Sequence, residues 1–217
     1  MGIEVICTTP PVTANKQLDP PLTRSQLFSR GAKTGAALLV AGSALGRFAD
    51  TAKAEPLSDG DLAYARLLIG LELLSIDFYA RSLAAKQFKA PAQKRLRTAL
   101  AHEQAHYQSV GQILVGAGLT PAGDGDIDFT YPAGAFKKPG AIAKLGFQLE
   151  TMSVGAYLGA VSGLQSSQLV QQMARIAASE AQHLSAFGSS LGRPFGFAFP
   201  APLPIDQISI ALDAFES

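Results

Sequence analysis

Apolar residues recur at helical spacing in four long segments of the chain, at 59–87, 91–117, 139–161 and 167–191. Within each segment they repeat at alternating intervals of three and four residues, the pattern of an α-helix with one buried face. Ser58 stands where a cap would begin the first helix, Pro91 can open the second, and Gly118 can end it. A shorter helical pattern at 205–215 follows a proline-rich segment. These patterns predict an all-α protein.

The connection between the second and third helices, at 119–138, is rich in proline and glycine. About twenty residues are too many for a tight turn, but they suit a crossover along the length of a helix bundle. We therefore expect two antiparallel hairpins joined by this crossover, which together form a four-helix bundle with a proline-rich C-terminal tail.

Within the four long predicted helices, glutamates occur only near the middle. Between residues 56 and 215 the chain has only Glu72, Glu103, Glu150 and Glu180. Each of them interrupts an apolar stripe, where a surface residue is not expected. Because a buried carboxylate without compensation costs several kcal/mol, we expect cations among these side chains.

Two of the four glutamates are followed by a histidine three residues later, in the pairs Glu103/His106 and Glu180/His183. Residues i and i+3 share a helix face, so a single metal ion can take an oxygen from one and a nitrogen from the other. The spacing from the single glutamate to the next pair is 31 residues in the first half and 30 in the second. The two halves therefore resemble each other, and we expect them to face each other across a pseudo-two-fold axis.

A tyrosine follows each single glutamate by seven residues, Tyr79 after Glu72 and Tyr157 after Glu150. Both tyrosines fall on the apolar face of their helix. We expect them to pack in the core beside the site with hydrogen-bonded hydroxyl groups, rather than to act as redox partners.

This arrangement resembles the ferritin-like di-iron carboxylate bundles, which place a glutamate on two helices and Glu-x-x-His on the other two. The stretches LELLSIDFYARSL (71–83) and LETMSVGAYLGAV (149–161) are similar to the exported bacterial and plant ferritin-like family that includes desiccation-related proteins. The resemblance covers roughly residues 58–191. By matching positions, it implies a ferritin-like bundle with six metal ligands: Glu72, Glu103, His106, Glu150, Glu180 and His183.

The ligand types favour two ions of iron, or else manganese, over copper or structural zinc. Four carboxylates balance the charge of two divalent ions. The expected function is a di-metal centre that oxidises iron(II) or consumes oxygen or peroxide. The alternative is a stress- or desiccation-associated bundle in which the metals only hold the fold.

Residues 102–106 also match H-E-x-x-H, a zinc-peptidase signature in which both histidines bind the metal. That interpretation needs a third protein ligand, and the next histidine is His183. It also leaves Glu72 and Glu150 unexplained. We therefore expect His102 to neighbour the site, about 100° around the helix from Glu103, and not to bind the metal.

Residues 1–54 have the order of an export signal. Arg24, Arg30 and Lys33 precede an apolar stretch at 35–46, and Ala-Lys-Ala ends the segment at 52–54. The stretch TRSQLF resembles a twin-arginine motif, although a serine stands where the second arginine belongs. We expect export to the periplasm or the outside, with residues 55–217 as the ferritin-like domain; a short N-terminal helix is the alternative.

The composition of the chain argues against several classes of partner and site. The chain of 217 residues is 47% hydrophobic and 16% charged, so it can bury a core. Its net charge of +1 and the lack of a long basic run argue against a nucleic-acid partner. No apolar run reaches about 18 residues, so no membrane-spanning helix is expected. Cys7 is the only cysteine, which excludes cysteine-based metal sites. A homo-oligomer is compatible with the sequence, which leaves the number of subunits open.

Overall fold

The computed structural model describes residues 56–193 and 200–216. These residues form five helices: α2 (Asp59–Ala84), α3 (Ala90–Gly116), α4 (Pro139–Gly163), α5 (Ser167–Ser190) and α6 (Ile205–Asp213). They form no strand beyond an isolated bridge between Phe129 and Glu216. The predicted all-α class is therefore confirmed. The predicted export segment, residues 1–54, lies outside the described residues, as does Cys7.

The helix ends agree with the predicted ones to within two residues, except at the end of α2. The side chain of Ser58 caps α2 by accepting a hydrogen bond from the backbone N–H of Asp61 (3.1 Å). However, α2 ends at Ala84 and does not continue to residue 87. Lys86 adopts a left-handed backbone conformation, with φ of 53°, and this conformation stops the helix. The apolar periodicity could not reveal that turn.

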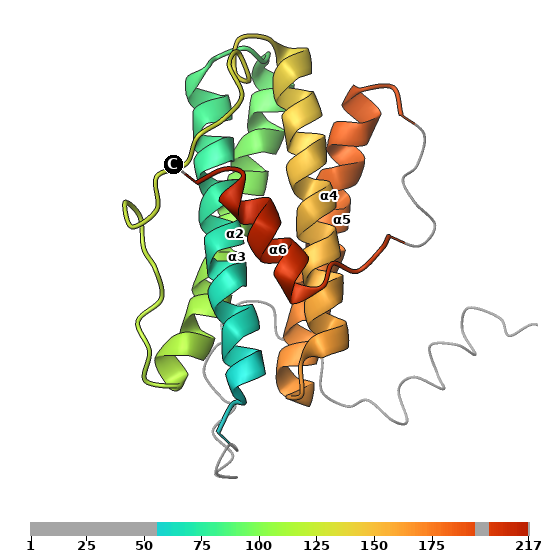
Figure 1. The fold of residues 1–217 in the computed structure, drawn as a ribbon. Helices are drawn as coiled ribbons and strands as arrows, with labels where there is room; N and C mark the ends of the chain where they lie inside the picture. Colours follow the sequence, from blue (N-terminus) through green and yellow to red (C-terminus); the bar gives the residue numbers. More distant parts are fainter. Residues whose placement is uncertain (1–55, 194–199, 217) are drawn as a thin grey trace, which may run out of the picture. The chain divides into compact units, whose positions relative to one another are not determined.

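The long helices form two antiparallel hairpins, α2 with α3 and α4 with α5 (Figure 1). Residues 117–138 run along the bundle from the end of α3 to the start of α4, as the predicted crossover requires. The hairpins meet through contacts of α2 with α4 and sparser contacts of α3 with α5. The C-terminal helix α6 lies across α2 and α4.

Helix α2 is buried around more of its circumference than one apolar stripe predicts. Leu71 and Leu74 are 0% exposed, although they lie about 100° and 160° around the helix from Glu72. The outer face of α2 is covered by side chains from the crossover and α6, since a Cβ on Gly70 would contact both Leu212 and Ile127. The C-terminal segment therefore extends the core of the bundle.

The proline-rich tail lies against α4. The backbone N–H of Leu203 donates a hydrogen bond to the carbonyl of Gly155 (2.8 Å). A Cβ on Gly159 would overlap the carbonyl oxygen of Leu203, so only glycine permits this close approach. Among the described residues, no helix combines the length and the apolar character that crossing a membrane demands.

Candidate metal centre

The four mid-helix glutamates lie together inside the bundle, one from each long helix. Each of them is at most 2% exposed, while His183 is 7% exposed and the side chain of His106 is 12% exposed. The helical spacing explains this placement, because each glutamate falls on the face that its helix turns toward the other three. The structure thus brings together all six residues that the resemblance implies.

The ligand atoms of these residues form two groups, in each of which the atoms lie within 4.8 Å of one another. The first group consists of Glu72, Glu103, His106 and Glu180. The second consists of Glu103, Glu150, Glu180 and His183. The glutamates of both Glu-x-x-His pairs belong to both groups, which is the arrangement of two carboxylates shared between two adjacent cation positions.

The histidines are arranged symmetrically across the hairpins. His106 Nδ1 lies 2.8 Å from Glu180 Oε1 and 3.5 Å from Glu103 Oε2. His183 Nδ1 lies 2.8 Å from Glu103 Oε1 and 3.3 Å from Glu180 Oε2. Each histidine is therefore closer to the glutamate of the other hairpin than to that of its own motif, in agreement with the expected pseudo-two-fold axis.

Most of the converging atoms make no hydrogen bond within the described residues, despite these short distances. The buried cluster atoms that make no hydrogen bond are Glu72 Oε2, Glu103 Oε1, Glu150 Oε2, both carboxylate oxygens of Glu180, and Nδ1 of His106 and of His183. The two imidazole nitrogens stand at ion-pair distance from carboxylate oxygens, but a buried polar atom without a hydrogen bond costs about 1–3 kcal/mol, so this cluster needs an explanation. Oxygen and imidazole donors without sulfur fit iron or manganese, and bound cations would satisfy these atoms.

The pKa shifts of the two single glutamates also indicate a site that lacks positive charge. Burial raises the pKa of Glu72 and of Glu150 well above the usual value, and the nearby carboxylates of Glu103 and Glu180 raise both further. Without a metal, protonation of these two side chains reduces the negative charge of the cluster.

At the two histidines, burial and the neighbouring carboxylates shift the pKa in opposite directions. Burial alone would lower the pKa of His106 and of His183, but the close carboxylates of Glu103 and Glu180 outweigh it and raise both pKa values to about 9. At Glu180, burial alone would raise the pKa, but the two histidines outweigh burial and lower that pKa to about 2. The metal-free cluster therefore holds protons where divalent cations would otherwise supply positive charge.

The two tyrosines fix the single glutamates. The hydroxyl of Tyr79 donates to Glu150 Oε1, and that of Tyr157 donates to Glu72 Oε1. Each bond joins α2 to α4 and leaves the second oxygen of the glutamate, Oε2, facing the cluster without a partner. Both tyrosines are buried, as expected, and they orient carboxylates in the way that outer partners of a metal site do.

His102 lies beside the cluster, outside both ligand groups. Its Nδ1 is 3.0 Å from His183 Nε2, and the two rings stack with 5.3 Å between centroids. His183 thus presents Nδ1 to the carboxylates and Nε2 to His102. Because the first and last histidines of H-E-x-x-H do not share a ligand group, the geometry gives no support to a peptidase site.

The family model described as "Ferritin-like domain" matches residues 60–193, a stretch that contains all six cluster residues. The chain belongs to this family. No curated protein matches the chain. Membership in the ferritin-like family agrees with the all-α bundle and with a buried Glu/His cluster that could hold metal ions.

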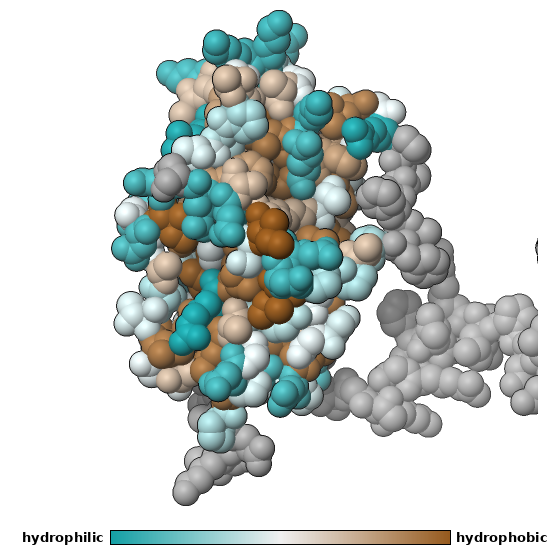
Figure 2. Space-filling view, viewed as in Figure 1, coloured by the Kyte–Doolittle hydropathy of each residue, from teal (hydrophilic) through white to brown (hydrophobic). Residues whose placement is uncertain are grey.

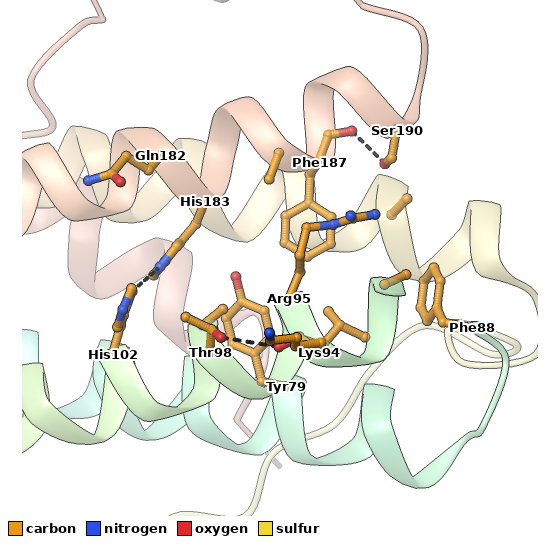
Figure 3. A pocket seen from close by; sticks show the side chains of 15 residues that line it. Tyr79, Phe88, Lys94, Arg95, Thr98, His102, Gln182, His183, Phe187 and Ser190 are labelled. Atoms are coloured by element: carbon orange, nitrogen blue, oxygen red, sulfur yellow. Dashed lines mark hydrogen bonds between the residues drawn. The ribbon is translucent and has the colours of Figure 1, made fainter. Parts of the chain in front are cut away.

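One feature of this ferritin-like domain escaped the sequence analysis. A pocket of about 400 Å³ opens between α3 and α5, with His102 and His183 at one end and Phe88 at the other (Figure 3). Four of its fifteen lining residues are alanines, which carry no chemical signal in a sequence. The pocket can be found only once the helices are placed side by side.

Proposed function

We propose that this ferritin-like protein binds two redox-active metal ions, iron in preference to manganese, in the Glu/His cluster. The observation that carries the proposal is the set of buried carboxylate and imidazole atoms without hydrogen-bond partners. Glu72 and His106 would hold one ion, Glu150 and His183 the other, and Glu103 and Glu180 would contact both. Four carboxylates match the charge of two divalent cations.

Such a pair of ions would supply electrons to dioxygen or peroxide, so the activity we propose is oxidation of iron(II) or consumption of oxygen or peroxide. The chain itself contributes position and environment. Tyr79 and Tyr157 hold the single glutamates in place, and the two hairpins keep the cluster in the dry interior. A low-polarity environment strengthens the attraction between the carboxylates and bound cations.

Anaerobic titration of the full chain with iron(II), followed by mixing with oxygen or peroxide, tests this proposal. We expect saturation at two ions per chain and oxidation of the bound iron. Asp124→Ala, which changes an exposed carboxylate of the crossover, should behave as the unaltered protein does. Failure to bind iron or manganese would refute the proposal; binding without turnover would favour the bundle in which metals only hold the fold.

We also propose that the protein is exported and belongs to the branch of the family that includes desiccation-related proteins. The export layout of residues 1–54 and the stretches at 71–83 and 149–161 support this assignment. Mass spectrometry of the native protein should find Glu55 at or near the N-terminus. An intact Met1 or Gly2 terminus on protein recovered from the cytoplasm would contradict export.

A further inference from the structure

The pocket beside the cluster lies between the first half of α3 and the last half of α5, where these two helices make only sparse contacts. Its volume of about 400 Å³ falls within the range of small-molecule sites. Its apolar wall includes Phe88, Ala92, Leu96, Ala99, Ala186 and Phe187. Because four of the lining positions are alanines, counting Ala143 of α4, neighbouring helices leave space that larger side chains would fill.

The cations of this pocket are Lys94 and Arg95, both exposed on α3. Figure 3 shows the side chain of Arg95 extending from α3 toward α5. Among the described residues, neither Lys94 nor Arg95 forms an ion pair with a carboxylate, whereas Arg81 pairs with Asp77 at 2.6 Å. Two unpaired cations therefore border an apolar hollow.

This pocket opens at a strongly basic end of the domain. The segments 78–102, 129–149 and 181–193 contain no aspartate or glutamate. Their exposed lysines and arginines, besides the paired Arg81, are Lys86, Lys89, Lys94, Arg95, Arg97, Lys137, Lys138, Lys144 and Arg193. Figure 2 shows hydrophilic side chains interspersed with less polar ones at the upper end, where α2 and α5 end and α3 and α4 begin. Linear sequence hides this concentration, because the cations come from segments far apart in the chain.

From this juxtaposition we infer that the pocket binds an amphipathic organic anion, with its charged head at Lys94 and Arg95 and its apolar body along the alanine-lined wall toward His183. The unpaired cations attract the head, and the basic end raises the local concentration of anions. A hydrocarbon body against the apolar wall removes apolar surface from water, which favours binding. An extended polyanion would use the surface cations alone and leave the hollow empty. The inference goes beyond the proposed function and does not depend on it, since all these contacts come from protein side chains.

Isothermal calorimetry with decanoate, at a concentration below micelle formation, tests the inference on the full chain, both metal-free and manganese-loaded. We expect saturable binding of one decanoate per chain, and binding of neutral decanol weaker by about tenfold or more, because the alcohol lacks the charge-assisted contacts. Equal affinities for the two ligands would overturn the assignment of an anion site. No binding of decanoate to either form would overturn the inference altogether.

Two double variants that reverse charge locate the site of the anionic head. Lys94→Glu combined with Arg95→Glu should weaken decanoate binding by about tenfold or more and leave decanol unaffected. Lys137→Glu combined with Lys138→Glu makes the same charge change at the same end but outside the pocket, and should have a much smaller effect. Equal weakening by both double variants would mean that the positive potential of the whole basic end attracts decanoate. The assignment of the pocket as its binding site would then be wrong.

Two single variants of α5 test whether the ligand occupies the pocket itself. Ala186→Phe places a ring at an exposed lining position and should abolish binding of both ligands. Ala181→Phe, at an exposed position of α5 outside the lining, should bind both as the unaltered protein does. Thermal unfolding of each variant checks that the fold is kept. Unchanged decanoate affinity in folded Ala186→Phe would overturn the inference.

Discussion

Removal of metal should reverse the pH dependence of stability between pH 6.5 and 9. In the metal-free protein, His106 and His183 have pKa values of about 9, against 6.5 in an unfolded chain. A raised pKa stabilises the fold fully below pH 6.5, and that contribution is lost as the pH rises through about 9. At 1.36 kcal/mol per pKa unit, each histidine accounts for at most about 3 kcal/mol.

The single glutamates act in the same direction. The pKa values of Glu72 and Glu150 are raised in the fold, so the folded state keeps protons that the unfolded chain releases above about pH 4.5. The metal-free fold is therefore further weakened as the pH rises. The lowered pKa of Glu180, about 2, stabilises the fold above the usual value of 4.5 and is lost only in stronger acid, outside this window. Bound metal replaces the protons, so its stabilising effect should grow with pH.

The assay is thermal unfolding of the full chain at pH 6.5 and pH 9, with a chelator or with saturating manganese(II). We expect the melting temperature of the chelated protein to fall by about 10 °C over this range, at roughly 2–4 °C per kcal/mol, and that of the loaded protein to hold or rise. Replacing both cluster histidines with glutamine should flatten the slope of the chelated protein. A melting temperature that is constant or rising with pH in the chelated protein would mean that the protonated histidines do not stabilise the metal-free fold.

Other substitutions test separate parts of the account. Glu180→Ala should reduce metal binding at both positions and abolish turnover, whereas Glu180→Leu should lose metal but keep or gain metal-free stability, as elemental analysis and melting curves would show. Tyr157→Phe removes the hydrogen bond to Glu72 and should weaken manganese binding by about 10–100-fold in a calorimetric titration; unchanged affinity would deny the tyrosine an orienting role. Gly159→Ala should destabilise the fold by about 1–3 kcal/mol in urea unfolding, because its Cβ overlaps the tail, while Gly116→Ala, with nothing within 4 Å, should not; equal effects would contradict that contact.

The fold and the composition of the cluster follow from the sequence because helical periodicity assigns each residue to a face. A glutamate that interrupts an apolar stripe must lie inside the bundle, and two Glu-x-x-His pairs state how the ligands are grouped along each helix. Sequence spacing does not state how they are grouped across helices. The sharing of Glu103 and Glu180 between two positions depends on the distance between hairpins, which only the packed structure supplies.

The features that the sequence did not predict arise from contacts between segments that are distant in the chain. Helix α2 loses part of its exposed face because α6 and the crossover cover it, and no local pattern reports a contact between segments so far apart. The buried Asp61 looks like an ordinary first-turn acid in the sequence, yet its side chain accepts a hydrogen bond from the backbone N–H of Gln165 (2.8 Å). The pocket and the basic end are likewise assembled from distant segments.

The most direct test of the di-metal assignment is anomalous diffraction from crystals of the full chain loaded with manganese(II) or, without oxygen, iron(II). We expect two strong peaks inside the bundle, both in contact with Glu103 and Glu180, one beside His106 and the other beside His183. Absence of any peak within the cluster, or peaks confined to surface carboxylates, would contradict this assignment.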